Sequence, residues 1–181
     1  MPKQKKTDSR NGAAAFTLIE IMVTVVILGI VALIAVPMMS GAADMQVRGA
    51  ANRLAADLEY AKNMAITHQS PFTVAFDTSA SSYEVYDVDS ALITHPVTRG
   101  DFVVSFPDQR GLGQVRINAA GTSFDGQDEV TFDYLGTPYS GTNTTSELNS
   151  GVITLQDTTG SFALYVKVEP MTGYVTIEDS P

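Results

Sequence analysis

FTLIEIMVTVVILGIVALIAVPMM, residues 16–39, is a nearly unbroken apolar run that contains one acid, Glu20. Residues 16–36 alone would form roughly 31 Å of helix at about 1.5 Å per residue, close to the hydrocarbon thickness of a bilayer. The run therefore predicts a membrane-spanning helix. An ionised acid near the bilayer centre costs roughly 2.5–3.5 kcal/mol, so we expect Glu20 to have a function there.

The flanking residues predict how this helix is oriented. The preceding stub, MPKQKKTDSRNGAAA, has four basic residues and one acid. Basic residues favour the cytoplasmic side, so residues 40–181 are predicted to lie beyond the inner membrane. A cleaved secretory signal is the alternative. Its small residues would follow the apolar run, whereas Ala13, Ala14 and Ala15 precede it here.

The segment Phe16-Thr17-Leu18-Ile19-Glu20, after a basic leader and a small residue, resembles the type III signal of type IV pilins and type II secretion pseudopilins. Pro37 stands at the position where helices of that superfamily usually kink. The resemblance implies that prepilin peptidase cuts between Ala15 and Phe16 and that the new amine of Phe16 is methylated. Ala15 departs from the family, which usually has Gly before the cut.

The resemblance also implies a role for Glu20. In these families the acid is thought to pair with the N-terminal amine of a neighbouring subunit as helices stack into a filament. A charge left without its partner in an apolar environment costs several kcal/mol. Glu20 would therefore select the correct axial position of the subunit. The alternative is an acid that is merely tolerated near the cytoplasmic interface.

The composition describes an acidic chain of 181 residues with a formal net charge of −9. Removal of the leader, with four basic residues and one acid, would leave seven basic and nineteen acidic residues, a net charge of −12. The sequence has no Cys, so no disulfide is available and the fold must depend on its own core.

Beyond residue 40 the apolar pattern predicts an amphipathic helix and then strands. Apolar residues recur at steps of three and four, which places them on one face of a helix. They are Val47, Ala51, Leu54, Leu58, Ala61 and Ala65. The pattern ends near Gln69-Ser70-Pro71. Strands rich in Val, Ile, Phe and Tyr are then predicted at 72–76, 82–88, 102–106, 114–117, 130–134, 152–156, 162–168 and 174–177. The stretch 136–151 is expected to be an exposed loop without regular structure.

We therefore expect an α+β, pilin-like fold: a long N-terminal helix, membrane-spanning in its first half and amphipathic in its second, packed on a C-terminal antiparallel β-sheet domain. Residues 53–74 and 151–177 are similar to the GspH/FimT branch of pseudopilins and minor pilins. The expected division is a cleaved leader at 1–15, an assembly helix at 16–39, its amphipathic continuation at 40–69, and a periplasmic β-rich domain at 70–181.

The resemblance implies an assembly protein of the inner membrane, single-pass, with its N-terminus cytoplasmic. Its expected function is that of a minor pseudopilin of a type II secretion system; the alternative is a type IV minor pilin that primes pilus assembly. Its expected partners are other pseudopilins or pilins, prepilin peptidase/methyltransferase, the inner-membrane assembly platform and the membrane itself.

Other classes of function have weaker support. His68 and His95 stand in no metal-ligand spacing, so no catalytic residue, cofactor or metal is expected. The acidic residues 125–129 are expected to form a solvated turn, with calcium as the alternative. Nucleic acid is disfavoured by the negative charge, because DNA affinity depends on cations. Tyr174 and Thr176 replace the arginines of DNA-uptake relatives. A cluster of Arg99, Arg110 and Arg116 is the remaining basis for DNA binding.

Overall fold

The computed structural model describes residues 17–180, apart from the side chains of residues 33–40. It divides into two units, Met1–Met39 and Ser40–Pro181, and each is described by itself. The helix α1, Leu18–His68, is common to both. It ends where the sequence predicts: Gln69 has a left-handed φ of 55° and Pro71 provides no N–H to continue the helix.

One face of α1 in the second unit is fully buried. The predicted stripe lies at 0 % exposure throughout, and Ala50 joins it. Residues off the stripe, such as Arg48 and Asn52, are exposed. Four of the seven buried residues are alanines, whose small side chains allow the helix backbone to approach the sheets closely.

The first sheet has the strand order β3-β2-β1-β6-β7, and all of its pairs are antiparallel. Its strands are β1 Phe72–Asp77, β2 Ser82–Tyr86, β3 Val103–Ser105, β6 Glu129–Phe132 and β7 Pro138–Ser140. Alternate residues of β1, Phe72, Val74 and Phe76, face the core, as expected for a strand with one face on the core.

The second sheet has the order β10-β9-β8-β4, with β5 also paired to β8. Its strands are β4 Val115–Ile117, β5 Ser123–Phe124, β8 Gly151–Asp157, β9 Ala163–Val168 and β10 Val175–Glu178. A short 3-10 helix, η1 Ala119–Gly121, precedes β5. These pairs are antiparallel as well, so the predicted α+β fold, a long helix followed by an antiparallel β-sheet domain, is confirmed.

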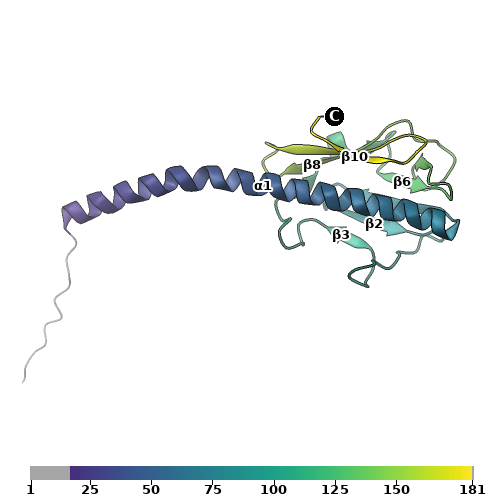
Figure 1. Cartoon of the computed structure of the whole chain (residues 1–181), viewed down its shortest axis with the longest axis horizontal. Helices are drawn as coiled ribbons and strands as arrows, with labels where there is room; N and C mark the ends of the chain where they lie inside the picture. Colours follow the sequence, from purple (N-terminus) through teal and green to yellow (C-terminus); the bar gives the residue numbers. More distant parts are fainter. Residues whose placement is uncertain (1–16, 181) are drawn as a thin grey trace, which may run out of the picture. The chain divides into compact units, whose positions relative to one another are not determined.

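Both sheets and the second half of α1 share one core. In Figure 1 this part of α1 lies along the sheets, with β8 and β10 on one side of it and β2 and β3 on the other. The two sheets meet through aromatic rings: Phe76 of β1 stacks on Phe124 of β5 with ring centroids 5.4 Å apart. The core therefore holds the helix and the two sheets together without a disulfide.

A polar link joins α1 to the first sheet. The hydroxyl of Tyr83 donates to Asp57 Oδ2 at 2.6 Å, and Arg53 Nε lies 3.6 Å from the same oxygen. Arg53 also donates to Gln109 in the turn after β3. Burial, with the neighbouring Asp57 carboxylate, raises the pKa of Tyr83 well above its usual value, so the phenol stays a neutral donor.

The prediction of an irregular loop over 136–151 is wrong at its start. Residues Pro138–Ser140 form β7, an edge strand paired with β6 in the register Val130↔Ser140 and Phe132↔Pro138. Pro138 is tolerated because its nitrogen faces away from β6, so the ladder with β6 loses no hydrogen bond. On that outer side the amide of Leu148 donates to the Pro138 carbonyl at 3.2 Å. Ser123–Phe124 is a second strand that the sequence pattern did not predict, since two residues give no periodicity.

Substitution at Ala61 tests the close approach of α1 to the sheets. Ala61→Leu is expected to lower the free energy of unfolding by about 1–3 kcal/mol, because extra methylenes in a filled core force side chains to shift. Ala56→Leu, on the exposed face of the same helix, is the matched control and should change it by less than about 0.5 kcal/mol. Urea unfolding measures both, and equal effects would contradict the packing described.

Acid sensitivity tests the turn between β8 and β9. Burial raises the pKa of Asp157, but hydrogen bonds from Thr159, Phe162 and Ser161 outweigh it and lower the pKa from 3.8 to about 2. Because the pKa of Asp157 is lower in the folded chain than in the unfolded chain, the ionised carboxylate stabilises the fold. This stabilisation is complete above pH 3.8 and is lost as the pH falls towards 2. The contribution is about 2 kcal/mol.

Asp157→Asn should therefore be less stable than the wild type at pH 7, and the difference should shrink between pH 4 and pH 2. Thermal melts of both proteins across this range measure the difference. Parallel pH profiles would contradict the assignment.

Candidate assembly site

The predicted processing and assembly residues fall partly outside the described structure. Ala15 and Phe16 lie outside the described residues. Pro37 lies within α1, in the run whose side chains are not described. Thr17 and Glu20 are described in full, so the geometry of the site begins with them.

Thr17 and Glu20 form a reciprocal cap at the start of α1. The amide of Glu20 donates to Thr17 Oγ1 at 3.3 Å, and the amide of Thr17 donates to Glu20 Oε2 at 3.5 Å. The pattern Thr-x-x-Glu is a capping box, which satisfies amides that the first turn of a helix leaves without partners. This role was not predicted from the sequence, although the spacing that indicates it is present in residues 17–20.

The carboxylate of Glu20 is exposed and lies in the first turn of the helix. A negative charge there is favoured by the helix dipole. Among the described residues Glu20 belongs to none of the ion pairs. The cap holds the carboxylate in place with its charge still available to a cation from outside the chain.

The helix around Glu20 presents apolar side chains on all sides. Leu18 is 78 % exposed and Ile19 70 %. The apolar residues that follow are at least half exposed: Ile21, Met22, Val23, Val25, Val26, Ile27, Leu28, Ile30 and Val31. A continuous exposed surface of this kind indicates contact with another apolar phase or partner. Where the structure is described, no helix meets the combined length and apolarity required to cross a membrane.

Both histidine rings make contacts with residues close to them in the fold. His68 is exposed at the end of α1, with Nδ1 3.1 Å from the carbonyl of Met64. His95 is buried, accepts the amides of Val97 and Thr98 at Nδ1, and packs on Phe102 with ring centroids 4.4 Å apart. Both rings therefore form local hydrogen bonds with the backbone, His68 at the end of α1 and His95 in the loop between β2 and β3.

The acidic residues 125–129 form a turn whose first carboxylate already has partners. Asp125 accepts the backbone amides of Asn149 at 2.7 Å and Ser150 at 3.1 Å. In the part of the chain that the structure describes, no group of three or more potential ligands is arranged to hold a metal. The Asp125 carboxylate instead links this turn by hydrogen bonds to the two residues that precede β8.

The three arginines considered for DNA binding lie on different elements. Arg116 is on β4 and donates to the carbonyls of Gly113 and Val115. Arg99 lies in the loop between β2 and β3, and Arg110 in the turns between β3 and β4. Tyr174 is exposed beside β10, whose Glu178 pairs with Lys167 at 2.6 Å.

A long N-terminal helix packed on antiparallel sheets, with a capped acid near its start, defines a pilin-like protein. The prokaryotic N-terminal methylation motif matches residues 10–36. The model of the type II transport protein GspH matches residues 50–172, more than half of the chain. The chain belongs to the GspH family, and is a minor pseudopilin or a minor pilin.

Two solved structures illustrate what the chain is similar to. The minor pseudopilin EpsH from the Type 2 Secretion System of Vibrio cholerae is 9 % identical, with a TM-score of 0.53 over 74 % of this chain and 97 % of that one. The type IV minor pilin FimU of Pseudomonas aeruginosa is 14 % identical, with a TM-score of 0.46 over 75 % of this chain and 88 % of that one. No curated protein sequence matches the chain.

Proposed function

We propose that this protein is a minor pseudopilin of a type II secretion system, built into a periplasmic pseudopilus through its N-terminal helix. The proposal rests on the capped carboxylate of Glu20, which belongs to none of the ion pairs of residues 17–180, on a helix whose apolar side chains are exposed. Membership in the family of the type II transport protein GspH supports the choice of system. The chain acts by assembly and has no catalytic role.

Maturation starts at the cytoplasmic face of the inner membrane. Prepilin peptidase removes residues 1–15 by cutting between Ala15 and Phe16, and the amine of Phe16 is methylated. The methylation motif over residues 10–36 supports this step. Residues 16–39 then cross the membrane once, residues 40–69 continue the helix, and residues 70–181 face the periplasm. The basic leader supports this orientation.

Assembly pairs Glu20 with the N-terminal amine of a neighbouring pseudopilin. Both charges then lie in an apolar environment. A subunit at the wrong axial position in the filament would leave each charge unpaired, at a cost of several kcal/mol. Pro37 bends the helix where it leaves the membrane, since Pro removes one helical hydrogen bond. The assembly platform of the inner membrane supplies the subunits to the growing filament.

A type IV minor pilin would use the same helix chemistry, and it is the alternative. Deletion of the gene distinguishes the two systems: loss of protein secretion with intact pili supports the proposal, whereas loss of pili with intact secretion supports the alternative. A role in DNA uptake has the least support, because the end of the chain is acidic where cations would be needed.

Processing is tested on the protein recovered from membranes. N-terminal sequencing and mass spectrometry are expected to give a chain that begins with N-methylated Phe16. A chain that keeps its basic leader, or that begins after Met39, would contradict the assignment. Ala15→Gly restores the residue usual in the family and should be processed at least as completely as the wild type.

The charge of Glu20 can be separated from its role in the cap. Glu20→Gln retains an oxygen that accepts the Thr17 amide but removes the charge, so it should insert and be processed normally and yet enter filaments at least about tenfold less. Thr17→Ala retains the charge and weakens the cap by about 1 kcal/mol, so it should assemble almost normally. The measurement is recovery of each mature variant with sheared filaments.

The opposite pattern, in which the Gln variant assembles and the Thr17 variant does not, would reduce Glu20 to a helix cap. Glu20→Ala, which lacks both functions, is the reference for complete loss. Membrane insertion of all three variants is checked by carbonate extraction.

A further inference from the structure

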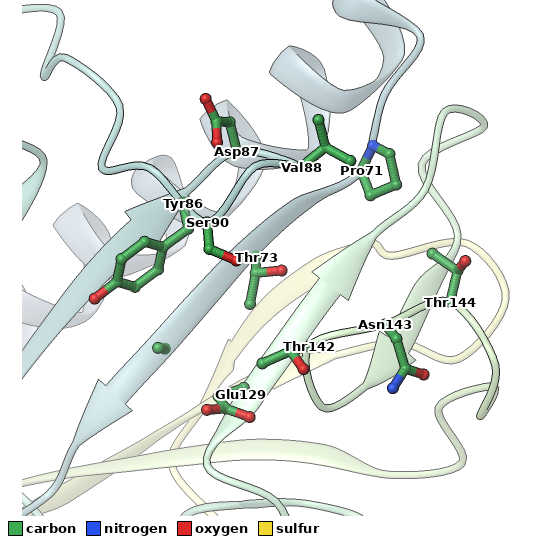
Figure 2. Close-up of a pocket in the computed structure, with 11 residues that line it drawn as sticks. Pro71, Thr73, Tyr86, Asp87, Val88, Ser90, Glu129, Thr142, Asn143 and Thr144 are labelled. Carbon is green, nitrogen blue, oxygen red and sulfur yellow. The ribbon is translucent and has the colours of Figure 1, made fainter.

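The outer face of the first sheet has an open hollow of about 470 Å³, shown in Figure 2, and most of the residues that line it are polar. Thr73 in its floor is hydrogen-bonded to Thr131, with 2.8 Å between the two hydroxyl oxygens. The register of the sheet places Ala75 between Glu84 on β2 and Glu129 on β6, in one row on this face. A different surface, beside the last turns of α1, is apolar.

Two turns on this second surface expose apolar side chains to solvent. Leu135, in the turn 133–137 between β6 and β7, is 69 % exposed, and Met171, in the turn 169–173 between β9 and β10, is 78 % exposed. Both line one hollow of about 230 Å³ together with Tyr139 of β7. We call Leu135, Met171 and Tyr139 the turn patch.

The two turns are fixed by hydrogen bonds and by contact with each other. Asp133 Oδ1 accepts the amide of Leu135 at 2.9 Å. Lys62 Nζ of α1 donates to the carbonyl of Gly173 at 3.0 Å. A Cβ atom on Gly173 would lie 2.6 Å from the carbonyl oxygen of Gly136 in the other turn, so the two turns touch. The turn patch is therefore held in place before a partner arrives, which lowers the entropy lost on binding.

Met171 has a backbone conformation that is unfavourable for its own side chain. Its φ of 62° lies in the left-handed region, which Gly and Asn occupy more readily than other residues do. Its exposed side chain also keeps an apolar surface in contact with water. Neither feature stabilises the fold, so together they indicate a function for Met171 at this surface.

The rim of the turn patch is acidic. Asp133 and Glu147 line the same hollow, and none of its lining residues is Lys, Arg or His. Glu147 is exposed and belongs to none of the ion pairs of residues 17–180. Partial burial, and then these two carboxylates, raise the pKa of Tyr139, so its hydroxyl stays neutral beside them. An apolar centre with an acidic rim complements an apolar side chain that has a base next to it.

We propose that the turn patch binds the β domain of a neighbouring filament subunit, through an aliphatic side chain flanked by Lys or Arg. This inference rests on the function proposed above. Ile66 of α1 lies against Gly136, so the patch adjoins the helix that this function places beside other subunits. A second copy of the same patch is disfavoured as the partner, because acids would then face acids.

Coverage of the turn patch is tested in the assembled filament. The chain has no Cys, so Leu135→Cys, Met171→Cys and Val97→Cys each introduce a single thiol. Val97, 82 % exposed in the loop between β2 and β3, is the control. In detergent micelles all three thiols should react readily with a water-soluble maleimide. In sheared filaments the thiols at positions 135 and 171 should react at least about tenfold more slowly, whereas the thiol at position 97 should keep its rate.

Substitutions separate binding at the patch from folding. Met171→Asn should unfold at the same urea concentration as the wild type or a higher one, because Asn tolerates the left-handed φ. The same variant should be recovered with sheared filaments at least about fivefold less. Glu147→Gln should also lower recovery, whereas Asp89→Asn, an exposed acid outside the hollow, should not.

Three results would overturn the proposal: unchanged thiol rates in filaments at position 135 or 171, equal slowing at position 97, or normal recovery of Met171→Asn. Absence of the wild-type chain from sheared filaments is a different result. It would contradict the proposed function, and the inference about the turn patch with it.

Discussion

A single helix of 51 residues, α1, has two different surroundings along its length. In residues 18–31 apolar side chains are exposed all around the helix. In residues 47–65 the apolar side chains form one buried stripe. The first pattern suits contact with apolar partners on every side, and the second suits contact with a domain on one side.

The small residues of the buried stripe explain how residues 47–65 of α1 pack closely against both sheets. Alanines at positions 50, 51, 61 and 65 allow close approach, and fully buried aromatic rings from both sheets fill the space around them. The Tyr83–Asp57–Arg53 link adds a directional contact at the edge of this core. These contacts hold residues 47–65 of α1 in one core with both sheets.

The sequence predicted those parts of the fold that follow from periodicity. The buried stripe of α1, its end near Pro71 and eight of the strands were predicted because burial repeats every three to four residues in a helix and every two in a strand. β5 was missed because two residues give no periodicity, and β7 was missed because Pro138 lies in a stretch rich in Gly, Ser, Thr and Asn, which favours a loop.

The site was only partly predictable for a similar reason. Glu20 stands out in the sequence because it is an acid among apolar residues, and the Thr17 cap could have been found from its spacing. The row of Glu84, Ala75 and Glu129 could not, since the two glutamates are 45 positions apart in the chain and come to lie on either side of Ala75 only through the register of three strands. Such juxtapositions require the pairing of the sheet, which local patterns do not specify.

We propose that Glu20 pairs with the N-terminal amine of another subunit. It is tested most directly by solid-state NMR of assembled filaments in which this chain has ¹³C-labelled Glu and the neighbouring subunits have a ¹⁵N-labelled N-terminal amine. A dipolar coupling that places the Glu20 carboxyl carbon within about 4–5 Å of that nitrogen is predicted, as in an ion pair. Filaments that contain the chain but give no such coupling would contradict the claim.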